Sequence, residues 1–160
     1  MKTVLLLRGP VRLTETLLLG FLGDHDARVD LVPYVTRQDE LCVAQGIVNP
    51  DRNSLILDHP LPPHIRRIAI DAALNETDVD FVAAVVAGTG YRGECQHSCD
   101  LLANGIRVVW GFVGRPMPQL RERAEYVTVM KGHRTSKIET ITLDPGRAWG
   151  TLCRTLGMPV

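Results

Sequence analysis

The sequence lacks an excess of charge, a long apolar run and a signal for export. Its 18 basic and 18 acidic side chains cancel, which excludes a strongly basic nucleic-acid arm and leaves only a local basic patch open. No run approaches the roughly 18 apolar residues of a transmembrane helix. The first apolar run, Val4–Leu7, is followed by Arg8, Gly9 and Pro10 and is too short for the core of a signal peptide. We therefore expect a cytoplasmic protein of one domain with no membrane partner.

The four cysteines are too few and too widely spaced for a disulfide framework or a paired CxxC metal motif. Cys95, His97 and Cys99 lie close together in sequence, but on a helix residue 97 points about 200° away from residue 95. A zinc site would need further ligands, such as Cys153 or His133. We expect Cys95 and Cys99 to be small buried side chains, and we assign no metal.

Two common catalytic motifs are absent as well. There is no GKS or GKT, so the chain is not a P-loop protein. Ser98 and Ser136 have no G-x-S-x-G context, which gives no candidate for a hydrolase nucleophile. We therefore assign no catalytic residue.

The chain does contain alternating strand and helix patterns joined by short loops. Phe81–Ala87 is continuously apolar over the length of a strand, as in a central parallel strand covered on both faces. Strands are predicted at 2–7, 28–35, 54–57, 81–87, 106–113, 126–130 and 138–143. Helices are predicted from a Thr14 or Thr16 cap to Gly23, and at 38–45, 64–74, 94–103, 119–124 and 147–156. This alternation predicts an α/β fold with a Rossmann-like, doubly wound and mainly parallel sheet.

The pattern changes towards the end of the chain. We expect the α/β domain over residues 1–131 and a C-terminal strand–helix extension over 132–160. Trp149 and Leu152 would pack the extension onto the domain or onto a partner subunit, so a homodimer is left open.

Gly88, Gly90 and Gly93 spell G-x-G-x-x-G between a predicted strand and a predicted helix. In a Rossmann enzyme such a loop binds the phosphates of a nucleotide cofactor. Here the loop follows several earlier elements, no acidic residue for a ribose lies in 106–113, and Glu94 would repel a phosphate. A Rossmann-type enzyme with a nucleotide cofactor stays an alternative, and no other cofactor is expected.

A longer pattern runs through residues 65–129. It contains Ile70-Asp71-Ala72, the apolar strand at 80–87, the turn and strand at 104–108, and Leu120-Arg-Glu-Arg-Ala-Glu-Tyr126. In these phrases and their order the stretch resembles the C-terminal half of NYN domains, a branch of the PIN-like ribonucleases. The resemblance implies a parallel α/β sheet and a carboxylate cluster that holds a divalent metal for phosphodiester hydrolysis.

The metal-binding aspartates of that family are missing here. Where the family has S-G-D-x-D-F, this chain has Ala-Gly-Thr-Gly-Tyr-Arg at 87–92, so Thr89 and Tyr91 replace both aspartates. Arg8-Gly9 stands where an aspartate ends the first strand, and Ile65 where an acid is expected in the middle helix. The resemblance therefore implies a degenerate PIN-like domain that has lost hydrolysis by this mechanism.

The carboxyl ends of parallel strands would still form a crevice for ligands. Arginines, a hydroxyl, an aromatic ring and glycine N–H groups suit RNA or the phosphate of a nucleotide. The residues predicted to bind at this rim are Arg8, Gly9, Gly88, Thr89, Gly90, Tyr91, Arg92 and Arg115. Arg12 is expected at the same rim, and Lys131, His133 and Arg134 are further candidates for it. The remaining alternative is an assembly protein whose glycines only permit tight packing.

Overall fold

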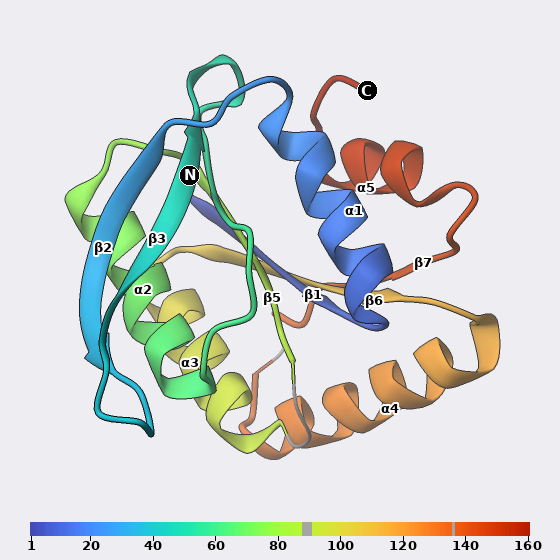
Figure 1. Cartoon of the computed structure of the whole chain (residues 1–160). Coiled ribbons are helices and arrows are strands. Elements are labelled where there is room, and N and C mark those ends of the chain that lie inside the picture. The colour runs from blue at the N-terminus through green and yellow to red at the C-terminus, as the bar shows by residue number, and fades with distance from the viewer. Residues whose placement is uncertain (88–90, 136) are drawn as a thin grey trace.

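The computed structural model describes residues 1–87, 91–135 and 137–160 (Figure 1). Its strands are β1 (Thr3–Arg8), β2 (Arg28–Val35), β3 (Leu41–Asn49), β4 (Ser54–Leu57), β5 (Phe81–Val85), β6 (Arg107–Val113) and β7 (Thr140–Leu143). Its α-helices are α1 (Val11–Leu22), α2 (Pro63–Glu76), α3 (Arg92–Ala103), α4 (Pro116–Gly132) and α5 (Ala148–Leu156), and Pro50–Arg52 forms a short 3₁₀ turn. None of the described helices is both long and apolar enough to cross a membrane.

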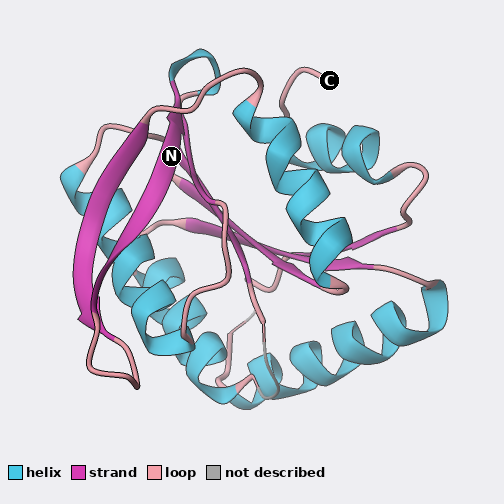
Figure 2. Cartoon of the chain, viewed as in Figure 1, coloured by secondary structure: helices cyan, strands magenta, loops and turns pink. Residues whose placement is uncertain are grey.

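One sheet joins these strands in the order β2-β3-β4-β5-β1-β6-β7. The five strands from β4 to β7 in this order run parallel, while β2 and β3 add an antiparallel hairpin at one edge. Helices cover both faces of the sheet (Figure 2). This confirms the predicted α/β class with a doubly wound, mainly parallel sheet.

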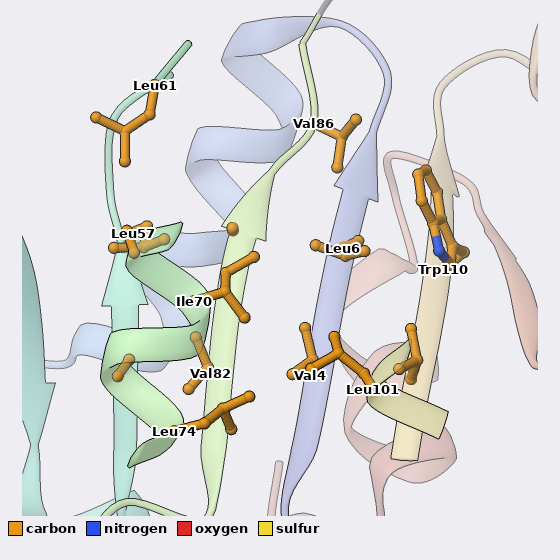
Figure 3. Close-up of a cluster of buried hydrophobic side chains, with 14 of the residues drawn as sticks. Val4, Leu6, Leu57, Leu61, Ile70, Leu74, Val82, Val86, Leu101 and Trp110 are labelled. Carbon is orange, nitrogen blue, oxygen red and sulfur yellow. The ribbon is translucent and has the colours of Figure 1, made fainter. Parts of the chain in front are cut away.

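The central strands are buried on both faces, because their side chains alternate between two layers of helices. In β1, Val4 and Leu6 point towards the face that α2, α3 and α4 cover, and they belong to the same buried cluster as Ile70 and Leu74 of α2 (Figure 3). Leu5 and Leu7 point to the other face, covered by α1 and α5. All four β1 side chains are fully buried. Continuous apolar runs such as β5 follow from this double cover.

The crossover connections share one hand. The connection from β1 to β4 contains α1, which covers one face of the sheet. The helices α2, α3 and α4 cover the other face, and each of them connects two strands in the opposite direction along the sheet. Because direction and face change together, the handedness stays the same. The connections that leave β1 and β6 diverge, so the crevice between the carboxyl ends of these two neighbours is the topological switch point.

The helix predicted at 38–45 is wrong, because this stretch belongs to the hairpin. β3 pairs antiparallel with β2, and the turn is closed by a hydrogen bond of 2.9 Å from the Thr36 N–H to the Glu40 carbonyl. Asp39 takes the positive φ of 59° that a glycine or asparagine often supplies. Gly46, directly after the predicted helix, lies inside β3, where a Cβ would come 2.6 Å from a methyl of Leu55.

The strand predicted at 126–130 is also wrong. These residues continue α4, and Tyr126 and Met130, four positions apart, are both buried on its inner face. Pro116 starts this helix, as proline does in a first turn. The parallel strand after β6 is β7, which pairs with β6 from Trp110 to Val113.

The cap predicted for the first helix is wrong too. α1 begins at Val11, directly after Pro10, and Thr14 lies within it. The Thr14 and Thr16 hydroxyls donate to carbonyls three and four residues back, at 2.8 and 2.7 Å. Of the remaining predicted elements, the helix at 119–124 lies within the longer α4, and the others are confirmed with ends within two residues of the prediction.

Candidate functional site

The carboxyl end of β1 places Arg8 on the face that α2, α3 and α4 cover. Side chains alternate along the strand, so Arg8 follows Val4 and Leu6 to that face. Its guanidinium lies 4.5 Å from the centre of the Tyr91 ring, and its Nε lies 3.3 Å from the Oε2 of Glu122 in α4. The Arg8 side chain is 11% exposed. Arg8 is therefore a nearly buried cation between an aromatic face and a carboxylate.

Tyr91, the residue before α3, forms the surface under Arg8. Its ring packs edge-on against Trp110 and Tyr126, with centroid distances of 6.2 and 5.9 Å. Its hydroxyl donates to the main-chain carbonyl of Glu122 at 3.3 Å. Burial raises the pKa of Tyr91 to about 12, although the charge of Arg8 opposes the shift. The phenol is thus neutral near pH 7, so Arg8 contacts the face of an uncharged aromatic ring.

Two more arginines reach the same rim from the first turn of α2. Arg66, only 1% exposed, donates from Nη2 to the Oε1 of Glu94 at 2.5 Å. Arg67 donates from Nη1 to the same oxygen at 3.1 Å. A Cβ at position 93 would lie 2.5 Å from that Nη1. The third glycine of the G-x-G-x-x-G pattern therefore makes room for an arginine.

Arg66 and Arg67 are not among the residues predicted for the site. The sequence marks them only as a pair of basic residues shortly after Pro62 and Pro63, where a helix begins behind a parallel strand. Nothing local in the sequence shows that one of the two is buried. Glu94, predicted to repel a phosphate, has its charge balanced by both arginines.

We call Arg8, Arg66, Arg67, Glu94 and Glu122 the arginine cluster: three guanidinium groups against two carboxylates. Burial lowers the pKa of Arg66, Glu94 opposes this, and the charges of Arg67 and Arg8 lower it further. The Nε and Nη1 atoms of Arg8 and Arg66 are buried and have no hydrogen-bond partner within the described parts of the chain. A buried donor without an acceptor costs about 1–3 kcal/mol, and more when it is charged. An anion would supply the missing acceptors.

A cavity of about 450 Å³, the switch-point cavity, opens between the carboxyl ends of β1 and β6. Gly9 and Gly114, directly after the two strands, and Arg115, directly before α4, help to line it. Glu122 lines it as well and also pairs with Arg8, so the cavity adjoins the arginine cluster. Open α/β sheets bind their ligands at this place in the fold.

The predicted rim residues divide into three groups. Gly9 and Arg115 line the switch-point cavity, while Arg8 belongs to the arginine cluster and Tyr91 forms the surface beneath it. Arg92 is exposed at the start of α3. The other predicted residues, Gly88, Thr89 and Gly90, lie outside the described residues.

Three basic residues considered for the rim lie elsewhere. Because 126–130 is helical, Lys131, His133 and Arg134 stand at or just beyond the carboxyl end of α4. At 1.5 Å per residue, that end is about 26 Å along the helix from Arg115. The prediction that gathered them with Arg115 is wrong.

The residues of the cysteine–histidine pattern point to different faces of α3. Cys95 is fully buried in the core beneath the helix, and burial raises the pKa of its thiol to about 12. His97 faces α2, with its Nε2 2.8 Å from the Oδ1 of Asp71. All four cysteines are free. Across the described residues, no group of three or more His, Cys, Asp or Glu side chains is arranged to hold a metal ion.

Comparisons with family models, with curated proteins and with solved structures find no match for this chain. Its function is therefore inferred from the geometry of the rim.

Proposed function

We propose that the chain is a PIN-like α/β domain, non-catalytic or altered in its chemistry, that binds a phosphate-bearing ligand at the carboxyl ends of its parallel strands. The ligand is RNA or a nucleotide. The observation that carries this proposal is the pair of guanidinium groups of Arg8 and Arg66, each with two buried nitrogen atoms that make no hydrogen bond within the described residues, although the Nε of Arg8 stays in ion-pair contact with Glu122. A planar guanidinium can donate two parallel N–H groups to the oxygens of a phosphate.

The carboxylates of the rim support an anion rather than a cation as the ligand. Glu94 accepts hydrogen bonds from Arg66 and Arg67, and Glu122 lies beside Arg8. A divalent ion placed there would have to displace at least one arginine from each carboxylate. The chain thus uses positive charge where the resembled family uses aspartates and metal.

The proposal also covers the cellular location of the protein and its self-association. We place the protein in the cytoplasm, which its four free cysteines support, because thiols stay reduced in that compartment. Self-association through the C-terminal extension stays a prediction. Trp149 of α5 packs 4.8 Å from Phe21 of its own chain, between ring centroids, so the proposed dimer would have to use the outer side of α5.

Calorimetric titration with ribose 5-phosphate and with a single-stranded RNA decamer tests the proposal. We expect saturable binding of at least one probe that weakens as salt rises. Arg8→Met should weaken it by about tenfold, since it removes one charge-assisted contact worth roughly 1.5 kcal/mol or more.

Arg154→Ala is the matched control, because Arg154 lies exposed in the last turn of α5 and its removal should leave binding unchanged. If neither probe binds, or if Arg154→Ala and Arg8→Met weaken binding equally, the proposal is wrong.

A further inference from the structure

We propose that the ligand at the rim is a nucleoside phosphate whose base enters the switch-point cavity and gives N–H groups to Gln119 and Glu122. This inference rests on the proposed function, because the arginine cluster supplies the site for the phosphate. It adds a second subsite and a class of ligand.

The switch-point cavity has the size and the lining of a small-molecule site. Its volume of about 450 Å³ falls in the range of roughly 300–1,000 Å³ that such sites span. Its walls are largely apolar and come from both strand ends, from α1 and α4, and from the segment after β7. The apolar side chains that form them are Pro10, Leu13, Val113, Pro118 and Pro145.

At the ends of β1 and β6 the cavity is lined by two residues without side chains, Gly9 and Gly114. Gly9 has a φ of +153°, and a Cβ there would lie 2.3 Å from the carbonyl oxygen of Val113. Gly114 has a φ of +133°, and its Cβ would lie 3.3 Å from the Cδ of Pro10. The ends of β1 and β6 therefore approach each other with bare backbone. Bare backbone and proline rings suit the face of a flat aromatic ring.

The polar groups of the cavity are few, and two of them accept hydrogen bonds. Gln119 is only 5% exposed, and its Nε2 donates to the Oδ1 of Asp144 at 3.0 Å. That bond orients the amide, so that Oε1 remains an acceptor, buried and without a partner in the described residues. Glu122, three residues further along α4, adds a carboxylate. A base that presents a ring N–H beside an amino group, as guanine does, matches two neighbouring acceptors.

The two subsites are joined by one side chain. Glu122 lines the cavity and also lies 3.3 Å from Arg8, through its Oε2. A base in the cavity would thus place its sugar and phosphate towards the arginine cluster. The half-buried Glu122 carboxylate, 36% exposed, lies where base and phosphate would meet. A small nucleotide can fill both subsites, whereas a bare sugar phosphate fills only one.

Calorimetric titration with guanosine 5′-monophosphate and ribose 5-phosphate separates the two subsites. We expect the nucleotide to bind at least tenfold more tightly than the sugar phosphate. Gln119→Leu should remove about tenfold of the nucleotide affinity and leave ribose 5-phosphate unchanged, while Arg8→Met should weaken both.

A second variant keeps the test independent of the Gln119 hydrogen bond. Leu13→Trp enlarges a side chain of the cavity wall on α1 and should block the nucleotide while ribose 5-phosphate still binds. Thermal unfolding of each variant checks that it folds.

The outcomes distinguish this inference from the proposed function. If ribose 5-phosphate binds with dependence on Arg8 but the nucleotide gains nothing, the base subsite is wrong and the phosphate site stands. If single-stranded RNA binds more tightly than the nucleotide and Gln119→Leu does not weaken it, the base subsite is again wrong. If no probe binds, the proposed function fails and this inference with it.

Discussion

Gly93 lies so close to Arg67 that any Cβ at position 93 would stand 2.5 Å from the Nη1 of that arginine. The guanidinium passes over the first turn of α3 to reach Glu94. The glycine of a phosphate-binding pattern thus serves an ion pair within the protein, and the pair in turn forms part of the arginine cluster.

Gly93→Ala should leave the fold intact and weaken anion binding. The atom that the new methyl would meet is the far end of a flexible side chain, so Arg67 can move away at little cost to stability. Its movement breaks the contact with Glu94. We expect a change of less than about 1 kcal/mol in the free energy of unfolding, together with a several-fold weaker affinity for ribose 5-phosphate, measured by calorimetry.

Gly132→Ala is the control for this change, since nothing lies within 4 Å of a Cβ there. It should keep the affinity of the wild type. Equal affinities for the two alanine variants would contradict a role for the Arg67–Glu94 contact in binding.

Gly9→Ala should destabilise the protein strongly. The new Cβ would stand 2.3 Å from a backbone oxygen of β6, and φ at this position is +153°. Backbone strain of this kind costs about 1–3 kcal/mol, and separating two paired strands adds to it. We expect the free energy of unfolding in urea to fall by more than about 2 kcal/mol.

Gly105→Ala isolates the part of that loss that comes from φ alone. Gly105 also has a positive φ, of +78°, but a Cβ there meets nothing within 4 Å. Its loss of stability should be clearly smaller. Equal losses would mean that the close approach of β1 and β6 contributes nothing.

Glu94→Gln should cost more stability than removal of the whole ion pair. The single change leaves Arg66 charged, 1% exposed and without its carboxylate. Breaking a buried pair in this way typically costs about 3–5 kcal/mol, whereas a neutral, apolar replacement of both partners costs far less. The double variant Arg66→Met with Glu94→Gln should therefore recover part of the loss. A double-mutant cycle from urea unfolding measures this coupling, and additive losses would contradict it.

Stability should decline in alkaline solution as Tyr91 ionises. Burial raises its pKa from 10.0 to about 12, so the folded state favours the neutral phenol. Such a group contributes its full stabilisation below pH 10, and the contribution is lost as the pH rises towards 12. Tyr91→Phe cannot ionise, so its free energy of unfolding should fall less steeply between pH 10 and 12. Identical slopes for the two proteins would exclude Tyr91 as the cause.

Local patterns predicted most of the fold and only part of the site. The apolar run of β5 and the helical stripe of α2 follow from side-chain spacing, which the sequence displays directly. At 126–130 the apolar residues also fit a helix, and only the packing of Tyr126 and Met130 against the core decides for α4. β3 was missed because strand pairing, rather than local propensity, makes it a strand.

The sequence by itself determined the layered α/β class, the order of most elements, and the presence of Arg8 and Tyr91 where parallel strands end. The tertiary structure alone decided which charges meet. Arg66 and Glu94 are 28 positions apart in the chain, and Gln119 and Asp144 are 25 apart. Contacts of that span depend on how β1, β5 and β6 are ordered in the sheet and on which face each helix covers. The local spacing of residues shows neither the strand order nor the face that each helix covers, so the arginine cluster and the switch-point cavity can be identified only in the folded chain.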